Sequence, residues 1–120
     1  LTKENSLTEK GGMINGIGDP PPNQHDAMTG SDAQGRLQTP IARIPPGAPA
    51  GAPPPAPPAN MTCNNWTSSG PGGVMVGHID RKGGGAAATS WNASHAGAGC
   101  SQENLVSTGG NGYFYCFATN

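Results

Sequence analysis

Glycine and proline limit what this chain can fold into, because they supply 20 and 13 of its 120 residues. Neither residue contributes an ordinary side chain to a core. Leucine, isoleucine, valine and phenylalanine make up only about 12 % of the chain, and a share below about 20 % is a warning of disorder. The formal net charge is only −1, so the chain is not a self-repelling charged tail. We therefore expect a loop-rich module with a thin core.

The composition also excludes several classes of protein. No stretch approaches the roughly 18 apolar residues of a membrane-spanning helix, and the start lacks the charged-then-apolar pattern of a signal peptide. No run of basic residues indicates nucleic-acid binding. We expect a chain that neither spans a membrane nor binds nucleic acid.

Cysteine occurs three times, at Cys63, Cys100 and Cys116. These spacings are too long for a zinc finger or ribbon. A catalytic thiol is one alternative, since His95 lies near Cys100 in the chain. Disulfide formation is the interpretation we favour, because a domain with a small core commonly depends on covalent cross-links for its stability. The odd count then leaves one thiol free or bonded to something outside this chain.

The first two parts of the chain are rich in turn formers. Within residues 1–44 we expect a short strand or tight turn at 13–18 and an ordered irregular loop at 19–36. Residues 45–59 are rich in proline and alanine, which predicts an extended linker or an inserted surface loop. The alternative for this segment is a docking site for an aromatic-lined groove.

Most of the packing potential lies in the third part, residues 60–120. Both tryptophans, both tyrosines, both phenylalanines and all three cysteines occur there. Apolar runs at 74–76 and 113–117 between glycine-rich turns predict short strands. A short helix is expected only at 101–106, where Ser101 can cap the first turn.

Five motifs in this third part occur together in a specific order. They are residues 62–69 (TCNNWTSS), 76–81 (VGHIDR), 90–95 (SWNASH), 99–102 (GCSQ) and 108–117 (TGGNGYFYCF). The upstream residues 23–26 (NQHD) and 29–31 (TGS) agree with the same pattern. The set resembles the C-terminal half of a family of bacterial secreted or envelope proteins with a C-type-lectin-like, endostatin-like fold.

The resemblance implies an α+β fold of short strands and long ordered loops, in a secreted, periplasmic or cell-envelope protein. It implies a disulfide between Cys63 and Cys100. It also implies that Cys116 pairs with a cysteine upstream of Leu1, so that these residues form part of a larger domain. The Pro/Ala run departs from the family pattern, which concerns surface contacts more than the fold.

Calcium-dependent sugar binding is not expected. Lectins of that kind use a Trp-Asn-Asp triplet, whereas Trp91 and Asn92 are followed here by Ala93, which offers no carboxylate for calcium. We predict no metal and no cofactor.

The histidines have two interpretations. His78 and Asp80 lie two residues apart, so along a strand they would point the same way. With His95 and the adjacent His25 and Asp26 they could contact a metal or a ligand. We favour the alternative that the histidines form hydrogen bonds to loop backbones.

Trp66 and Trp91 also have two interpretations, as a sugar-stacking platform or as main core residues, and we favour the core. Residues 80–82 are expected to form a solvated turn. Taken together, the candidate contact residues are His25, Asp26, Trp66, His78, Asp80, Arg81, Trp91, Asn92 and His95.

No Ser-His-Asp or paired-carboxylate arrangement indicates an enzyme. The function we expect is a non-catalytic extracytoplasmic recognition module that binds a glycan or another envelope component. The alternative is a structural or accessory subunit that docks on a larger envelope assembly.

Overall fold

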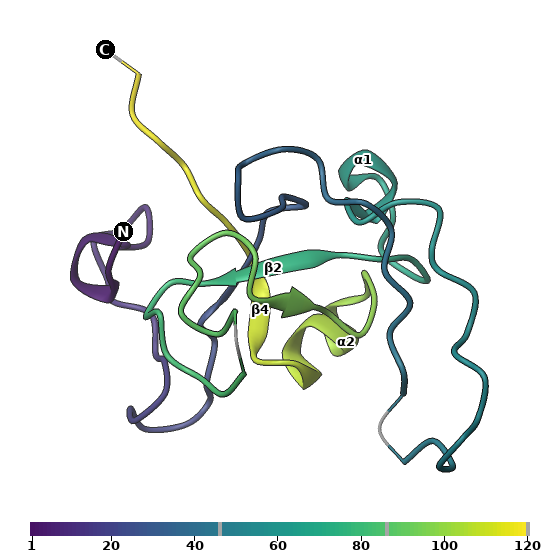
Figure 1. The fold of residues 1–120 in the computed structure, drawn as a ribbon. Coiled ribbons are helices and arrows are strands. Elements are labelled where there is room, and N and C mark those ends of the chain that lie inside the picture. The colour runs from purple at the N-terminus through teal and green to yellow at the C-terminus, as the bar shows by residue number, and fades with distance from the viewer. Residues whose placement is uncertain (46, 86, 120) are drawn as a thin grey trace.

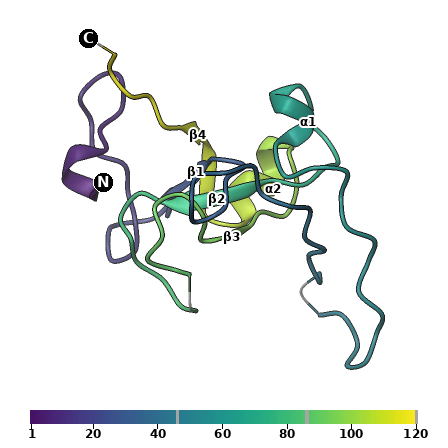
Figure 2. The same ribbon diagram turned by 45° about the horizontal axis from the view of Figure 1, so that its top comes forward.

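A mixed β-sheet organises the molecule. The computed structural model describes residues 1–45, 47–85 and 87–119. Its elements are η1 (Lys3–Asn5), β1 (Asp26–Met28), α1 (Cys63–Trp66), β2 (Met75–His78), β3 (His95–Ala96), α2 (Gln102–Ser107) and β4 (Gly110–Phe114). The strand order in the described sheet is β3-β2-β1-β4, with β1 antiparallel to β2 and parallel to β4 (Figures 1 and 2). The fold is α+β, with long loops between short elements.

The central strand β1 lies inside the segment that we expected to be irregular. That expectation is wrong for three residues, because Asp26, Ala27 and Met28 pair with β2 on one side and β4 on the other. Asp26 is the direct partner of His78 in the β1–β2 ladder. A three-residue strand among turn formers has no local signal, and its neighbours determine its conformation.

Alternation along the strands builds one small core on each face of the sheet. Val74 and Val76 pack with Leu105 of α2 and with the two disulfide cysteines. Ala27 packs on the other face in a second cluster; its buried partners are Ile14 and Ile79. The tryptophans belong to neither cluster, so the expectation that they form the main core is wrong.

The Cys63–Cys100 disulfide joins α1 to the loop before α2, with the Cα atoms 5.6 Å apart. This is the pairing that the resemblance implies. It closes a sequence separation of 37 residues, which restricts the unfolded chain and so stabilises the fold. Cys116 is exposed and has no disulfide partner among the described residues.

Helix α2 begins as its sequence predicts. The Ser101 hydroxyl accepts a hydrogen bond from the Asn104 backbone N–H at 3.2 Å, which satisfies one of the free donors of the first turn. The helix ends at Ser107, and β4 follows from Gly110. None of the helices in the described ranges is long and apolar enough to cross a membrane.

The single turn α1 is left-handed, since φ lies between 50° and 66° at all four of its residues. Asparagine tolerates this conformation better than most residues, and Asn64 and Asn65 occupy its centre. The Thr62 hydroxyl accepts a hydrogen bond from the Asn65 N–H at 3.0 Å. The Asn60 side chain accepts one from the Asn64 N–H at 2.9 Å. These bonds hold Trp66 at the end of the turn.

The Pro/Ala segment at 45–59 runs away from the sheet as a long excursion (Figure 1). Nearly all of its described residues are exposed. Pro46, within this predicted linker, lies outside the described residues, as do Ala86 and Asn120 in the third part of the chain. The 13–18 region forms no strand; a turn runs from Gly16 to Asp19.

Candidate functional site

Aromatic side chains border a surface groove of about 360 Å³. They come from α1, from the loop after Ser90 and from the end of β4. The five rings are those of Trp66, Trp91, Phe114, Tyr115 and Phe117.

The rings of the groove pack mostly edge to face. Trp66 meets Phe114 with centroids 5.1 Å apart and planes at 89°. Trp91 meets Tyr115 at 5.6 Å and Phe117 at 6.1 Å. Edge-to-face contacts of this kind favour fixed ring orientations. The groove is therefore lined by rings that support one another.

Three of these rings remain open to solvent. Trp66 is 41 % exposed, Phe114 51 % and Phe117 61 %. Large apolar groups gathered at one place on a surface mark a site of binding more often than the same groups scattered singly.

Asn92 anchors the groove and does not present its amide to it. The side-chain N–H groups donate to Ser31 Oγ at 3.1 Å and to the Asp32 carbonyl at 2.8 Å, and Oδ1 accepts from Ser90 Oγ at 3.0 Å. The residue is buried, with all of these bonds inside the chain. Arg81 is exposed, and its Nε donates to the Thr89 carbonyl at 3.0 Å.

A buried cluster on the sheet brings together the other residues singled out in the sequence. All three histidines of the chain turn Nε2 toward the Asp26 carboxylate. The distances to Oδ1 are 3.4 Å from His25 and 3.3 Å from His78, and the distance from His95 to Oδ2 is 3.5 Å. The cluster joins residues from β1, β2, β3 and the loop before β1.

The fifth polar group of this cluster, Asp80, supports His25. Its Oδ1 lies 2.8 Å from His25 Nδ1, and its Oδ2 accepts from the Ile17 N–H at 2.8 Å. The expected solvated turn exists, but the Asp80 side chain is fully buried. A side chain at Gly16 would collide with this carboxylate, so glycine there makes room for it.

The pKa values of the cluster are set by two opposing effects: burial disfavours the charged form of each group, and its hydrogen-bond partners favour that form. Burial acts to raise the pKa of Asp26, but His78 and His95 outweigh it and hold this pKa below its usual value. Burial likewise acts to lower the pKa of His78, and Asp26 raises it overall. The interaction with Asp26 raises the pKa of His95. For Asp80, burial is outweighed by the Ile17 N–H and His25, so its pKa is also lowered.

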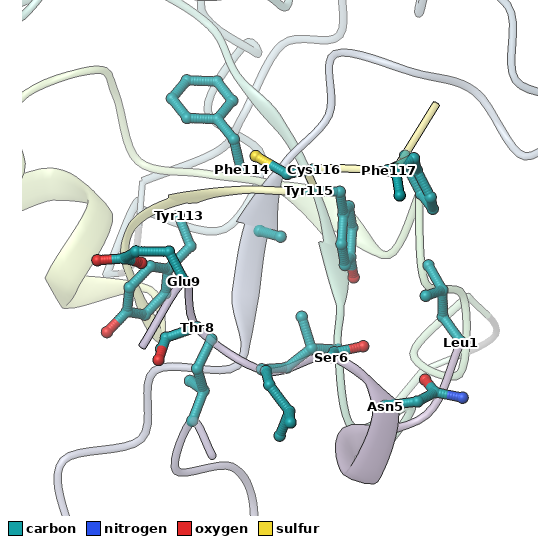
Figure 3. Close-up of a pocket in the computed structure, with 15 residues that line it drawn as sticks. Leu1, Asn5, Ser6, Thr8, Glu9, Tyr113, Phe114, Tyr115, Cys116 and Phe117 are labelled. Carbon is teal, nitrogen blue, oxygen red and sulfur yellow. The ribbon is translucent and has the colours of Figure 1, made fainter. Parts of the chain in front are cut away.

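A second hollow, of about 420 Å³, lies between the N-terminal residues and the end of β4. Figure 3 shows Tyr113 and Tyr115 projecting to one side of this strand segment and Phe114 to the other. The hydroxyl of Tyr115 is buried without a hydrogen-bond partner among the described residues. Burial raises the pKa of this phenol.

Phe114, Tyr115 and Phe117 are groove residues that sequence reasoning did not single out. Their signal was present in the aromatic run at 113–117, which we interpreted only as a strand. The structure ends β4 at Phe114, and the chain beyond it leaves the sheet and carries Tyr115 and Phe117 to the groove. Cys100 is engaged in the disulfide, so it is not the catalytic thiol that the sequence left open.

No family model, curated protein or solved structure matches the chain at a significant level.

Proposed function

We propose that the chain is a non-catalytic, lectin-like recognition module that acts outside the cytoplasm and binds a glycan of the cell envelope in its aromatic groove. The observation that carries the proposal is the exposure of Trp66, Phe114 and Phe117 around one groove. Exposed apolar rings cost free energy in water, which a ligand covering them recovers. Aromatic faces suit the apolar faces of sugar rings.

Preorganisation supports the same proposal. Trp66 lies at the end of the hydrogen-bonded turn α1, and Trp91 precedes the anchored residue Asn92. A ligand that meets rings already held in place loses less free energy to ordering them. The groove thus suits binding to a rigid partner such as a sugar ring.

The compartment and the fold are part of the proposal. A structural disulfide is compatible with an oxidising compartment, where such bonds persist. The short strands and long loops are compatible with the lectin-like resemblance of the five motifs, although fold by itself does not determine a ligand.

A second candidate function is that of an accessory subunit. The exposed Pro/Ala segment, which extends away from the sheet (Figure 1), favours it, because an extended proline-rich arm loses little conformational entropy when it docks on a partner. In this case the arm, and not the groove, would carry binding.

A glycan array followed by calorimetry on the best glycan tests the groove. We expect Trp66→Ala and Phe117→Ala each to weaken binding at least about tenfold, because each removes an exposed ring. Ile44→Ala serves as the matched control, since Ile44 is 63 % exposed and lies outside the groove. Thermal unfolding of each variant checks that it is folded.

The two candidate functions give different outcomes. Loss of glycan binding in both ring variants, with normal binding by Ile44→Ala, supports the groove. Absence of binding to any glycan, together with capture of an envelope protein that depends on residues 45–59, would instead favour the accessory subunit. Glycan binding that both ring variants retain would overturn the proposed site.

A further inference from the structure

Hydrogen bonding does not explain why the three histidines of the cluster all direct Nε2 at one carboxylate. His25, His78 and His95 come from separate parts of the chain, yet every Nε2 lies 3.3–3.5 Å from an oxygen of Asp26. One ligand atom from each of His25, Asp26 and His78 lies within 4.8 Å of the others. The three strands involved are adjacent in the sheet, so the arrangement is built into its register.

Nδ1, the ring nitrogen that faces away from Asp26, lies at hydrogen-bonding distance from an oxygen atom in each of the three histidines. His78 Nδ1 lies 2.7 Å from the carbonyls of Lys82 and Ala88. His95 Nδ1 lies 3.1 Å from the Ala96 carbonyl, and His25 Nδ1 lies 2.8 Å from the Asp80 carboxylate. Carbonyls and carboxylates only accept hydrogen bonds, so each Nδ1 carries the proton.

A neutral imidazole protonated on Nδ1 has a lone pair on Nε2. When the rings are neutral, all three lone pairs face a carboxylate, which is itself only an acceptor. Asp26 Oδ1, Asp26 Oδ2 and His78 Nε2 are buried and have no hydrogen-bond partner among the described residues. Asp26 and His78 are only 2 % and 4 % exposed. Buried acceptors that face one another need a positive centre between them, which is either a proton on a ring nitrogen or a bound cation.

We infer that His25 and His78, through Nε2, and Asp26, through its carboxylate, form a binding site for one divalent zinc ion, which the partly exposed His95 completes by turning its Nε2 inward. Zinc prefers four nitrogen, sulfur or oxygen ligands at tetrahedral angles. Zn–N bonds of about 2.0–2.1 Å place neighbouring ligand atoms about 3.3–3.4 Å apart. The distances from Asp26 Oδ1 to Nε2 of His25 and His78 lie in this range. His95 Nε2 lies 3.5 Å from Asp26 Oδ2 but outside the group of mutually close ligand atoms, so its ring has to move to bind the same ion.

The surroundings of the cluster have the pattern of an outer shell of a metal site. Histidine ligands of metals donate their other N–H to a carboxylate or a backbone carbonyl, which fixes the ring and raises its basicity. Asp80 does this for His25, and two backbone carbonyls do it for His78. Hydrogen bonding to the backbone, which we favoured from the sequence, accounts for Nδ1 of His78 and His95. His25 Nδ1 meets the Asp80 carboxylate instead, and the three Nε2 atoms stay unexplained.

His95 provides the route by which an ion enters. Its side chain is 38 % exposed, whereas those of His25 and His78 are nearly inaccessible. A bound ion would join β1, β2 and β3 on one face of the sheet. With His95 turned inward, three histidines and one carboxylate would fill four positions, so the site would be closed and its role structural.

Calorimetric titration of the chelator-treated full chain with zinc chloride tests the site. All proteins carry Cys116→Ser, because an exposed thiol would bind zinc by itself. We expect one zinc per chain. His95→Gln is the main variant, since its partly exposed position makes the fold least dependent on it, and we expect at least tenfold weaker binding. Asp80→Asn, which acts through His25, should weaken binding about 10–100-fold.

Two further measurements keep the result interpretable. Glu103→Gln removes an exposed carboxylate outside the cluster and should bind zinc normally. Co²⁺ in place of zinc should give the strong visible absorption of a tetrahedral site, and His95→Gln should change it. Absence of zinc binding would overturn the inference. Zinc binding that His95→Gln and Asp80→Asn leave unchanged would assign the ion to another place and overturn it equally.

Discussion

The imidazole rings of His25 and His78 stack with their centroids 4.0 Å apart and their planes at 19°. Two positively charged rings at this distance would repel each other. In the proposed zinc site both rings would be neutral and would share one ion with Asp26, which avoids this repulsion. Metal binding at this site would therefore stabilise the stacked arrangement.

Zinc should stabilise the fold measurably. A ligand at about 100 times its Kd adds about 2.7 kcal/mol to the free energy of unfolding, which corresponds to a rise in Tm of several degrees for a chain of this size. Thermal unfolding followed by circular dichroism, with zinc and after chelation, checks this. An unchanged Tm at saturating zinc would contradict a structural role for the ion.

Gly77 in β2 should be intolerant of any side chain. A Cβ at this position would collide with the backbone of Trp91 and Asn92, which crosses over the strand. Because backbone cannot move aside cheaply, we expect Gly77→Ala to lower the free energy of unfolding by at least about 2 kcal/mol or to prevent folding. Gly70→Ala is the control, since nothing lies within 4 Å of its Cβ, and urea denaturation should show nearly normal stability. Equal stability of the two variants would contradict the packing described here.

Asn65 should be replaceable by glycine at a lower cost in stability than by alanine. Its φ is 55°, a left-handed conformation that costs most residues about 1–2 kcal/mol. The side chain is exposed and is not needed for the bond to Thr62, which its backbone makes. We expect urea denaturation to show Asn65→Ala about 1 kcal/mol less stable than Asn65→Gly. A pair of variants with the same stability would show that the turn is not left-handed.

Tyr115 should make the protein sensitive to alkali. Burial raises the pKa of this phenol, so the folded protein keeps a proton that the unfolded chain loses above pH of about 10. The unfolded state then binds fewer protons, and the free energy of unfolding falls as the pH rises past this value. Denaturation at pH 9 and above should show a smaller fall for Tyr115→Phe. Parallel pH profiles for the two proteins would refute this role of Tyr115.

Local features of the fold were predictable from the sequence. The Ser101 cap, the short helix after it and the strands near Val74 and Tyr113 follow from capping and alternation, which act over a few residues. Bounds were less accurate: β4 runs from Gly110 to Phe114, earlier than the apolar run that predicted it. Pairing with Asp26 at its start and Met28 at its end sets those limits.

Long-range features were not predictable in the same way. The His–Asp cluster depends on the register that opposes Asp26 to His78, and neither residue carries a local signal of it. The exposure of Trp66 depends on the left-handed turn α1. The adjacent asparagines at 64 and 65 were a usable signal of that turn. The sequence did not show that aliphatic residues around Val74 and Val76 fill the core without either tryptophan; only the structure shows this.

The most direct test of the zinc site is anomalous diffraction from crystals of the zinc-loaded protein, measured on both sides of the zinc absorption edge. We predict one anomalous peak at bonding distance, about 2.0–2.2 Å, from the Nε2 atoms of His25, His78 and His95 and from the Asp26 carboxylate. A zinc peak elsewhere, with no density among these four side chains, would contradict the account.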